Sequence, residues 1–584
     1  MLEQTRFGSQ RGLEVRSRRP DHWLIAALLA PLFLLPLLAG ERIGEPVADD
    51  FDFLYHVLLT GQWSWFDGCG ANNYWRPLGR QAYYATFAPW MLHGPLVVAL
   101  VQLGCLCLTA VLLYRSFVPA LGRGAAFAVS TGPWMMESSR LLVAWPACFQ
   151  DVGALLFVSL ALHEAVMSRR WSFLAAGLAA LLCKEVTAIA LIAIVACPAV
   201  RFNTENQRRR WFVSTALLVS AWVALYGWVT LRASLALPVP ATSLSSPDWA
   251  PGIWLVPWWS FKAIWSMPPS GGPEDLLLVV GLIALTPWAR LRGIFRSEGL
   301  RLRAWWTWGF LWSIPLVLAL IPFYPGWGPY RLAFAGFGLL TAAVVTLRAL
   351  HRHAVPTFLA LRLGLLVLAP KPVHEIALTA PFRGASIDIP RLSRLQRFVP
   401  KVRATIQSRY PALPHGATVV WEGFPAMVEY AFGSGRALCV WYRDTTLRWV
   451  PISRWMTSTS SPAAAIVEFQ DLQNHEVALV EPDAMRAMLQ ANHDLNLGRE
   501  AESLRWLARA ESLQADTSAT LFRRSIAGKR AYALASQSFK ARRYAEARSH
   551  LHELLAAYPG DIPGRRMLSA LAETLAHHSE SSAR

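Results

Sequence analysis

The residues with the clearest chemical potential lie at positions 46–52, which read P-V-A-D-D-F-D directly after the first long apolar run. A carboxylate at such a position can act as a general base and take a proton from an attacking hydroxyl, and Asp49 or Asp50 would have this role. The alternative is helix capping, because aspartate is favoured at an N-cap and acids suit the first turn. Paired aspartates also suit Mg²⁺ or Mn²⁺, although nothing in the sequence requires a metal or another cofactor.

Two arginines follow the acids. The stretch Y-W-R-P-L-G-R-Q-A-Y-Y places Arg76 and Arg80 four residues apart, on one face of a helix if Pro77 occupies its first turn. A guanidinium matches the geometry of phosphate, so the pair could hold a phosphorylated substrate. The alternative is ordinary ion pairing within the loop.

Other ionisable residues interrupt or border apolar runs. Lys184 and Glu185 separate two short apolar runs, and they form either a self-paired couple at a hairpin tip or part of the same site. Asp151 lies a few residues into the apolar run 146–167. Its alternatives are a structural ion pair with Arg140 and a functional role, since charges inside a membrane are costly. Arg331 lies in P-Y-R-L and is a further candidate phosphate ligand.

The elements that position these residues are membrane helices. The chain is 54% hydrophobic and only 16% charged, with a mean hydropathy of +0.31, which is typical of a polytopic membrane protein. A spanning helix needs about 20 apolar residues, and we predict eleven spans in an α-helical fold. The predicted spans are 23–39, 92–114, 118–136, 146–167, 171–183, 186–200, 211–231, 275–289, 304–323, 330–347 and 354–369.

The net charge of +18 reflects topology rather than binding of nucleic acid. Arginines gather in alternate loops, such as those holding Arg169 and Arg170 or Arg208–Arg210, and basic loops remain in the cytoplasm. We therefore expect a cytoplasmic N-terminus, residues 1–22, and an extracytoplasmic loop, 40–91, that carries the acids. The Ala/Arg/Leu-rich composition indicates a bacterial inner membrane, with the C-terminal part in the periplasm.

The composition changes after the membrane domain, 23–370. Residues 371–481 contain short strand-like runs, A-T-V-V-W-E and A-L-C-V-W-Y, and predict a small mixed α/β unit. Residues 482–584 have a helical period, and R-A-Y-A-L-A-S-Q-S-F-K-A-R-R-Y-A-E-A-R fits a tetratricopeptide repeat. With about two repeats, this region either docks on the preceding unit or binds an acceptor peptide.

Taken in order, the acidic pair, the R-P-L stretch, the K-E pair and the late Tyr/Arg/Pro loop resemble the GT-C membrane glycosyltransferases. The likeness is strongest to bacterial relatives of the transmembrane and tetratricopeptide-repeat O-mannosyltransferases. The resemblance implies a polyprenyl-phosphate-linked sugar as donor and a protein or glycan hydroxyl as acceptor. It implies inverting transfer with Asp50 as base and Asp49 as its orienter, or the reverse. The family has R-Y where this chain has Tyr330-Arg331, which puts Arg331 in doubt.

Two other classes compete with this interpretation. A non-catalytic membrane scaffold would recruit partners through the C-terminal repeats, and the acidic pair would then be dispensable. A transporter would show interrupted spans at matched positions in two halves, and the sequence has no such repeat.

Overall fold

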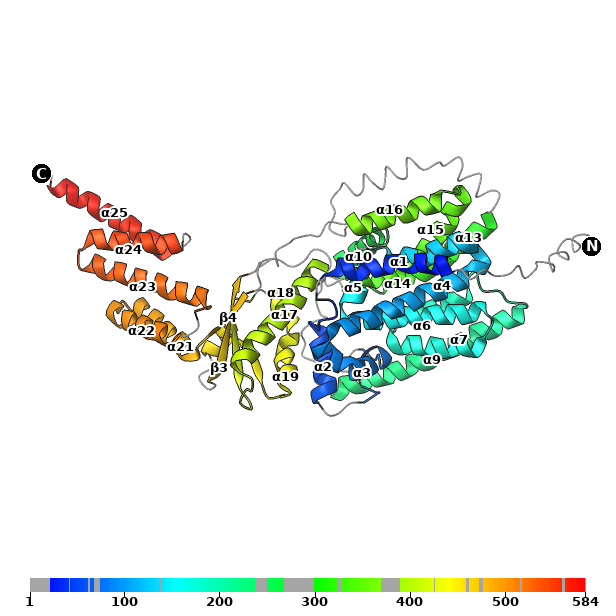
Figure 1. Cartoon of the computed structure of the whole chain (residues 1–584), viewed down its shortest axis with the longest axis horizontal. Helices are drawn as coiled ribbons and strands as arrows, with labels where there is room; N and C mark the ends of the chain where they lie inside the picture. The colour runs from blue at the N-terminus through cyan, green and yellow to red at the C-terminus, as the bar shows by residue number, and fades with distance from the viewer. Residues whose placement is uncertain are drawn as a thin grey trace, which may run out of the picture. The chain divides into compact units, whose positions relative to one another are not determined.

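The computed structural model describes most of the chain (Figure 1). The residues described are 22–40, 42–60, 64–67, 74–136, 138–236, 249–266, 299–323, 328–368, 389–424, 426–457, 462–471, 476–514, 517–558 and 562–582. They divide into two compact units. Unit 1 takes in the described residues of Met1–Pro46, Trp63–Pro372 and Pro381–Ser393, and unit 2 takes in those of Val47–Gln62, Val373–Ala380 and Arg394–Arg584.

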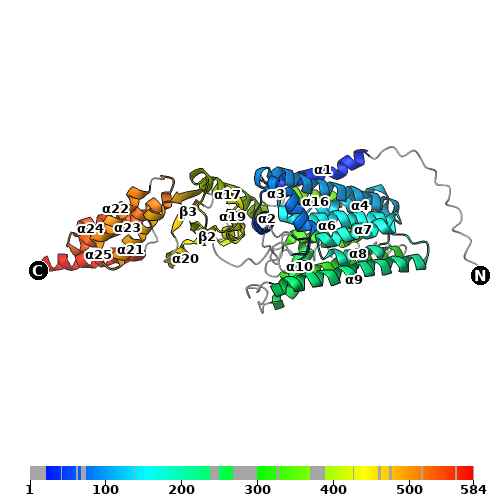
Figure 2. The ribbon, with the colours of Figure 1, turned by 90° about the horizontal axis from the view of Figure 1, so that it is seen from below.

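Unit 1 is a bundle of apolar helices. Both views show α4, α6 and α7 running alongside one another (Figures 1 and 2). The helices of this unit are α1 (His22–Ala39), α3 (Tyr83–His93), α4 (Pro95–Thr131), α5 (Ser139–Ala144), α6 (Phe149–Val166), α7 (Arg170–Cys183), α8 (Thr187–Val195), α9 (Glu205–Ala236), α10 (Trp249–Ile264), α13 (Gly299–Leu318), α14 (Leu332–Ala335), α15 (Phe337–Leu350) and α16 (Ala354–Leu368).

Several of these helices have the length and composition to cross a membrane, so the expectation of an α-helical chain with apolar helices is confirmed. In the part of the chain that the structure describes, three helices meet this test alone, Pro95–Trp134, Pro146–Val166 and Glu205–Arg232. A fourth candidate is Pro329–Leu350, which bends by 58°. The total of eleven stays a prediction, because several helices are shorter and the predicted span 275–289 lies outside the described residues.

One predicted boundary is wrong. The sequence predicts a turn at 115–117 between two spans, whereas α4 continues through these residues and breaks at Gly122, where φ is +71°. Only glycine adopts this backbone conformation readily, and Arg115 alone does not interrupt a helix whose neighbours are apolar.

Unit 2 contains a four-stranded sheet with the strand order β2-β1-β3-β4. Strand β1 pairs in parallel with both β2 and β3, while β3 and β4 are antiparallel. The strands are β1 (Thr418–Glu422), β2 (Arg448–Pro451), β3 (Ala463–Asp471) and β4 (Glu476–Val480). The helices that accompany the sheet are α2 (Asp49–Leu59), α17 (Ile389–Arg409, which begins in unit 1), α18 (Ala426–Ala431), α19 (Arg436–Tyr442) and α20 (Ile452–Thr457).

The prediction of a strand for A-L-C-V-W-Y is wrong, because these residues form α19. A short buried apolar run has no periodicity that separates a strand from a helix. Gly435 adopts a left-handed conformation with φ of +94° immediately before the helix, and this turn redirects the chain.

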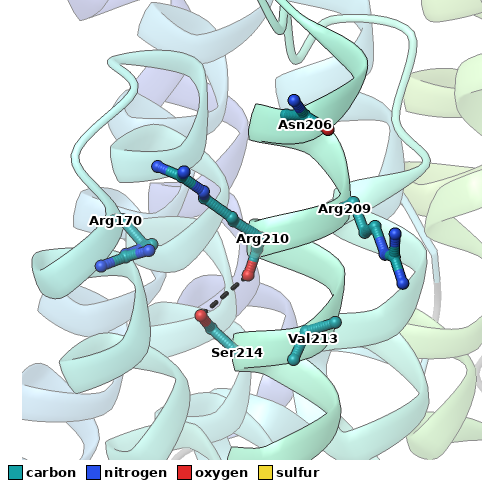
Figure 3. Close-up of a pocket in the computed structure, with 6 residues that line it drawn as sticks. All are labelled: Arg170, Asn206, Arg209, Arg210, Val213 and Ser214. Atoms are coloured by element: carbon teal, nitrogen blue, oxygen red, sulfur yellow. Dashed lines mark hydrogen bonds between the residues drawn. The ribbon is translucent and has the colours of Figure 1, made fainter.

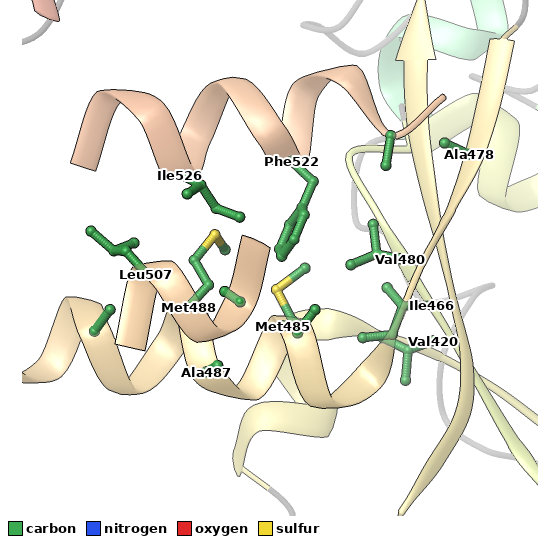
Figure 4. Close-up of a cluster of buried hydrophobic side chains, with 14 of the residues drawn as sticks. Val420, Ile466, Ala478, Val480, Met485, Ala487, Met488, Leu507, Phe522 and Ile526 are labelled. Atoms are coloured by element: carbon green, nitrogen blue, oxygen red, sulfur yellow. The ribbon is translucent and has the colours of Figure 1, made fainter. Parts of the chain in front are cut away.

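Five further helices complete unit 2. They are α21 (Pro482–Asn496), α22 (Glu500–Leu513), α23 (Thr520–Lys540), α24 (Tyr544–Ala557) and α25 (Ile562–Ser582). Met485 and Met488 of α21 pack with Phe522 and Ile526 of α23 against the sheet residue Ile466 (Figure 4). The first helices of this region therefore share one apolar core with the sheet.

Candidate functional site

The predicted arginine pair of unit 1 is positioned by a short π-helix, η1 (Leu78–Ala82), which follows Pro77. Gly79 lets this turn approach the end of α7 closely, since a Cβ at Gly79 would lie 2.7 Å from the carbonyl oxygen of Cys183. Arg76 and Arg80 are both buried. The close approach therefore brings two guanidiniums next to the Lys184-Glu185 segment.

Arg76 holds Glu185 with two hydrogen bonds. Its Nε and Nη2 donate to the two carboxylate oxygens at 2.7 Å and 2.5 Å. Burial by itself would raise the pKa of Glu185, but the charge of Arg76 and its hydrogen bonds outweigh burial and lower this pKa to about 2. Glu185 is thus a fixed negative charge in the turn between α7 and α8.

Lys184 forms an ion pair with Asp151 from the first turn of α6. Burial lowers the pKa of Lys184, and the Asp151 carboxylate opposes this effect. Arg331 lies within electrostatic range of Lys184, and its Nε donates to the Tyr330 hydroxyl at 3.3 Å. The predicted self-paired Lys184-Glu185 couple is therefore not the arrangement found, because each residue pairs with another element.

Gln150 was not predicted from the sequence, yet it connects the two arginines. Its Oε1 accepts hydrogen bonds from Arg76 Nη1 and from Arg80 Nε, the latter at 3.1 Å. Tyr74 also lies against both guanidiniums, with centroid distances of 4.5 Å and 5.3 Å. The only sequence signal for Gln150 is its position beside Asp151 at the start of an apolar run.

The residues that share this region make up what we call the cation cluster. Its members are Arg76, Arg80, Asp151, Lys184, Glu185 and Arg331, with Gln150, Tyr74 and Tyr330 as neutral neighbours. The cluster has four cations and two carboxylates, so it is net positive by two. Arg140 is buried and donates from Nη1 to the Leu38 carbonyl at 2.9 Å, while Asp151 has its ion pair with Lys184.

The predicted acidic pair belongs to unit 2, at the start of α2. Asp50 is fully buried, and its Oδ2 accepts the backbone N–H of Val47 at 2.8 Å. Asp49 is partly exposed, and its Oδ1 accepts the Tyr430 hydroxyl at 2.6 Å. The helix begins after Ala48, so both acids lie in the first turn rather than at the N-cap.

Helix α2 is held against the segment 431–442 of the same unit. The Ala48 N–H donates to the Ala431 carbonyl at 2.8 Å, and the ring of Phe51 packs edge-on against Trp441 at 6.0 Å. Gly433 has φ of +53°, and a Cβ there would lie about 3 Å from Phe51 and from the Ala48 carbonyl oxygen. Contacts remote in sequence therefore fix the orientation of the acids.

A cavity of about 580 Å³ in unit 2 includes Tyr55 of α2. Arg436, Arg448 and Arg454 line it together with Trp449 and Trp455. Arg436 connects it to the acids, since its guanidinium pairs with Asp52 at 2.8 Å and stacks over the Tyr55 ring at 5.5 Å. Guanidiniums and indole rings that line one cavity suit a ligand that has both apolar faces and negative charge.

The structure thus gathers the predicted cations Arg76, Arg80, Lys184 and Arg331 within unit 1, and the predicted base candidates Asp49 and Asp50 within unit 2. Among the described residues, no group of three or more His, Cys, Asp and Glu side chains could hold a metal ion.

Comparisons with known proteins give little further information. No family model matches the chain, and no curated protein matches it. A crystal structure of ArnT from Cupriavidus metallidurans bound to undecaprenyl phosphate is similar to this chain, with a TM-score of 0.42 and 12% sequence identity. The alignment covers 77% of this chain and 94% of that one.

Proposed function

We propose that this protein is a membrane glycosyltransferase of the GT-C kind, which moves a sugar from a polyprenyl-phosphate donor to an acceptor hydroxyl. The observation that carries this proposal is the cation cluster. Burying charges among apolar helices costs several kcal/mol per ion, roughly, unless they are paired. A buried cluster with an excess of two positive charges suits an anion such as the phosphate of a lipid-linked sugar.

The cluster supplies what the leaving group needs. As the bond between the sugar C1 and the phosphate oxygen breaks, the electron pair stays on the phosphate, and fixed cations stabilise the developing charge. Arg80, Lys184 and Arg331 are our candidates for this contact. Arg76 is committed to Glu185 through Nε and Nη2 and to Gln150 through Nη1, so we assign it a positioning role.

The acceptor requires a base, and we assign this role to Asp49 with Asp50 as its positioning residue. Asp49 is partly exposed and can reach a substrate, whereas Asp50 is buried and bonded to the Val47 backbone. Asp49 takes the proton of the acceptor hydroxyl while that oxygen forms the new bond to C1. Displacement in one step inverts the anomeric centre.

We further propose that the acceptor is a glycan that carries negative charge. The cavity beside α2 supports this assignment, because indole rings offer flat apolar faces to a sugar and arginines bind carboxylate or phosphate. The basic loops support placing the reaction on the extracytoplasmic face of a bacterial inner membrane. In this arrangement α21 and α22 have a docking role, since they share a core with the sheet.

The test is transfer of labelled sugar from polyprenyl-phosphate donors in membranes that contain the intact chain or single variants at equal expression. We expect Asp49→Asn to abolish transfer while donor binding is retained. Arg80→Gln and Lys184→Gln should weaken donor binding. Glu476→Gln, at the exposed start of β4, is the control for loss of a carboxylate in unit 2, and it should retain transfer from the donor.

A scaffold predicts a different pattern. The intact protein would then give no donor-dependent transfer across a panel of sugars, and Asp49→Asn would leave its partner binding unchanged. That result would overturn the enzyme proposal.

A further inference from the structure

A second group of arginines lies at the other end of α7. A cavity of about 410 Å³ is lined by the first residue of α7, Arg170, and by the first turns of α9 (Figure 3). The lining residues of α9 are Asn206, Arg209, Arg210, Val213 and Ser214. We call this cavity the arginine pocket. With 14 residues in α7, it lies about 21 Å along the helix from the Lys184-Glu185 turn, so it is separate from the cation cluster.

The arginines of the pocket lack acidic partners that their neighbours have. Arg169 pairs with Glu164 at 3.6 Å, and Arg208 pairs with Glu205 at 4.0 Å. In the described parts of the chain, by contrast, neither Arg209 nor Arg210 forms an ion pair, and none of the lining residues is acidic. Figure 3 shows the Arg210 side chain extending from α9 toward the side on which Arg170 lies. Like charges that gather without acids favour an anionic ligand.

The surroundings of the pocket are those of a membrane interface. Trp171, the next residue of α7, is 74% exposed, and Phe212 and Leu217 of α9 are 53% and 65% exposed. The candidate span Glu205–Arg232 has only 17% of its apolar window buried inside the protein. The apolar side chains are exposed next to the arginines of the pocket. In a membrane, this arrangement places the guanidiniums at the level of the lipid headgroups and the acyl chains beside the helix.

We propose that the arginine pocket binds the headgroup of an anionic phospholipid. The phosphodiester would accept hydrogen bonds from Arg170 and Arg210, Asn206 would contact the polar part of the headgroup, and the acyl chains would lie along Val213 and the exposed apolar side chains. Basic pockets between membrane helices are suited to such headgroups. The aligned N–H groups at the start of α7 add to the attraction for a phosphate. This inference does not depend on the proposed transferase activity.

The experiment is lipid binding by the full chain in a neutral detergent, measured by native mass spectrometry during titration with phosphatidylglycerol or phosphatidylcholine. We compare the intact protein with the double variant R170Q/R210Q and with the matched double variant R169Q/R208Q, which removes the same charge from the same helix ends. At about 1 kcal/mol per arginine, R170Q/R210Q should weaken binding of phosphatidylglycerol about 10- to 30-fold. R169Q/R208Q should change it less than threefold.

Three outcomes overturn the proposal. An equal loss of phosphatidylglycerol affinity in both double variants would show that the arginines act only through their summed positive charge. Such a charge is already expected of a cytoplasmic loop. Equal binding of phosphatidylcholine would exclude recognition of an anion. Displacement of the lipid by millimolar inorganic phosphate would assign the pocket to a free phosphate. If R170Q/R210Q is not folded by size-exclusion chromatography, R170K/R210K, which keeps the charge and loses the fork, should still weaken binding by more than R169K/R208K does.

Discussion

Glu185 in unit 1 and Glu468 in unit 2 are both largely buried carboxylates, yet their chemistry differs. Glu185 accepts two hydrogen bonds from the Arg76 guanidinium, and its pKa is lowered to about 2. Glu468 has neutral partners, the Gln470 amide and the Phe522 N–H at 3.2 Å. Burial raises the pKa of Glu468 to about 7. The Gln470 hydrogen bond partly opposes this effect, and the negative charge of Glu422 adds to it.

The difference separates the proposed phosphate site from a structural contact. A buried carboxylate that stays charged needs a cation beside it, as Glu185 has in Arg76. A buried carboxylate with neutral donors can take up a proton instead. Glu468 connects strand β3 to the start of α23, and among the described residues no cation pairs with it.

The largest expected effect comes from breaking the charged pair. Arg76→Gln leaves Glu185 charged without its partner. The free energy of unfolding should decrease by about 3 kcal/mol, the lower end of the range of about 3–5 kcal/mol for a broken buried pair. The measurement is the unfolding midpoint in detergent. Glu164→Gln provides the contrast, because its partner Arg169 is 60% exposed and such pairs contribute about 0–1 kcal/mol. Equal losses in the two variants would contradict the structural role given to the buried pair.

The buried carboxylate of Glu468 predicts an effect of similar size that depends on pH. The pKa of Glu468 is raised to about 7 in the folded chain, while the unfolded value is about 4.3. Between these values the folded state holds the proton and the unfolded state does not, so stability falls as pH rises from about 4.5 to 7. At about 1.4 kcal/mol per pKa unit, the loss should reach about 3–4 kcal/mol above pH 7.

Hydrogen exchange of the β3 and α23 amides in the full chain measures this local stability. Glu468→Gln should flatten its pH dependence, whereas Glu476→Gln, at the exposed start of β4, should leave it as it is. A slope that survives in Glu468→Gln would assign the dependence to another group.

The smallest effect concerns the acids of α2, whose orientation depends on packing rather than on a cation. Gly433→Ala should cost about 1–2 kcal/mol for the left-handed backbone, and its Cβ would crowd the Cβ of Phe51 at 3.0 Å. Gly416→Ala is the matched control, since Gly416 has φ of +75° with no atom within 4 Å of its Cβ position. Exchange of the α2 amides should increase in Gly433→Ala only. The same change in both variants would mean that α2 is not held at Gly433.

Local chemistry in the sequence predicts some elements closely. Residues 146–167 and 171–183 were predicted as apolar segments, and α6 and α7 end within a few residues of these limits, because the length of an apolar run limits a membrane helix. The arginine pair four residues apart does reach one group, Gln150. The break in α4 was placed wrongly because a charged residue does not end a helix, whereas a glycine with positive φ does.

The rest depends on contacts that no local pattern encodes. Arg76 and Glu185 are 109 positions apart, and Asp49 and Tyr430 are 381 positions apart. Each partner has an ordinary local alternative, a capping acid or a hairpin ion pair, so the sequence alone leaves both interpretations open. The misassigned α19 lies in the same segment that holds α2, which is why the packing of the acids in unit 2 was not anticipated.

The contact between α2 and the segment 431–442 also sets an order of events during synthesis. The acidic helix is made early, but Tyr430, whose hydroxyl donates a hydrogen bond to Asp49, is made 381 residues later. At a synthesis rate of about 5–20 residues per second, roughly 20 to 75 s pass between the synthesis of α2 and that of the segment against which it packs. The proposed base therefore reaches its final setting only after the membrane helices have been made, and a nascent chain that stops before residue 430 would leave Phe51 without its ring partner and the acids without orientation.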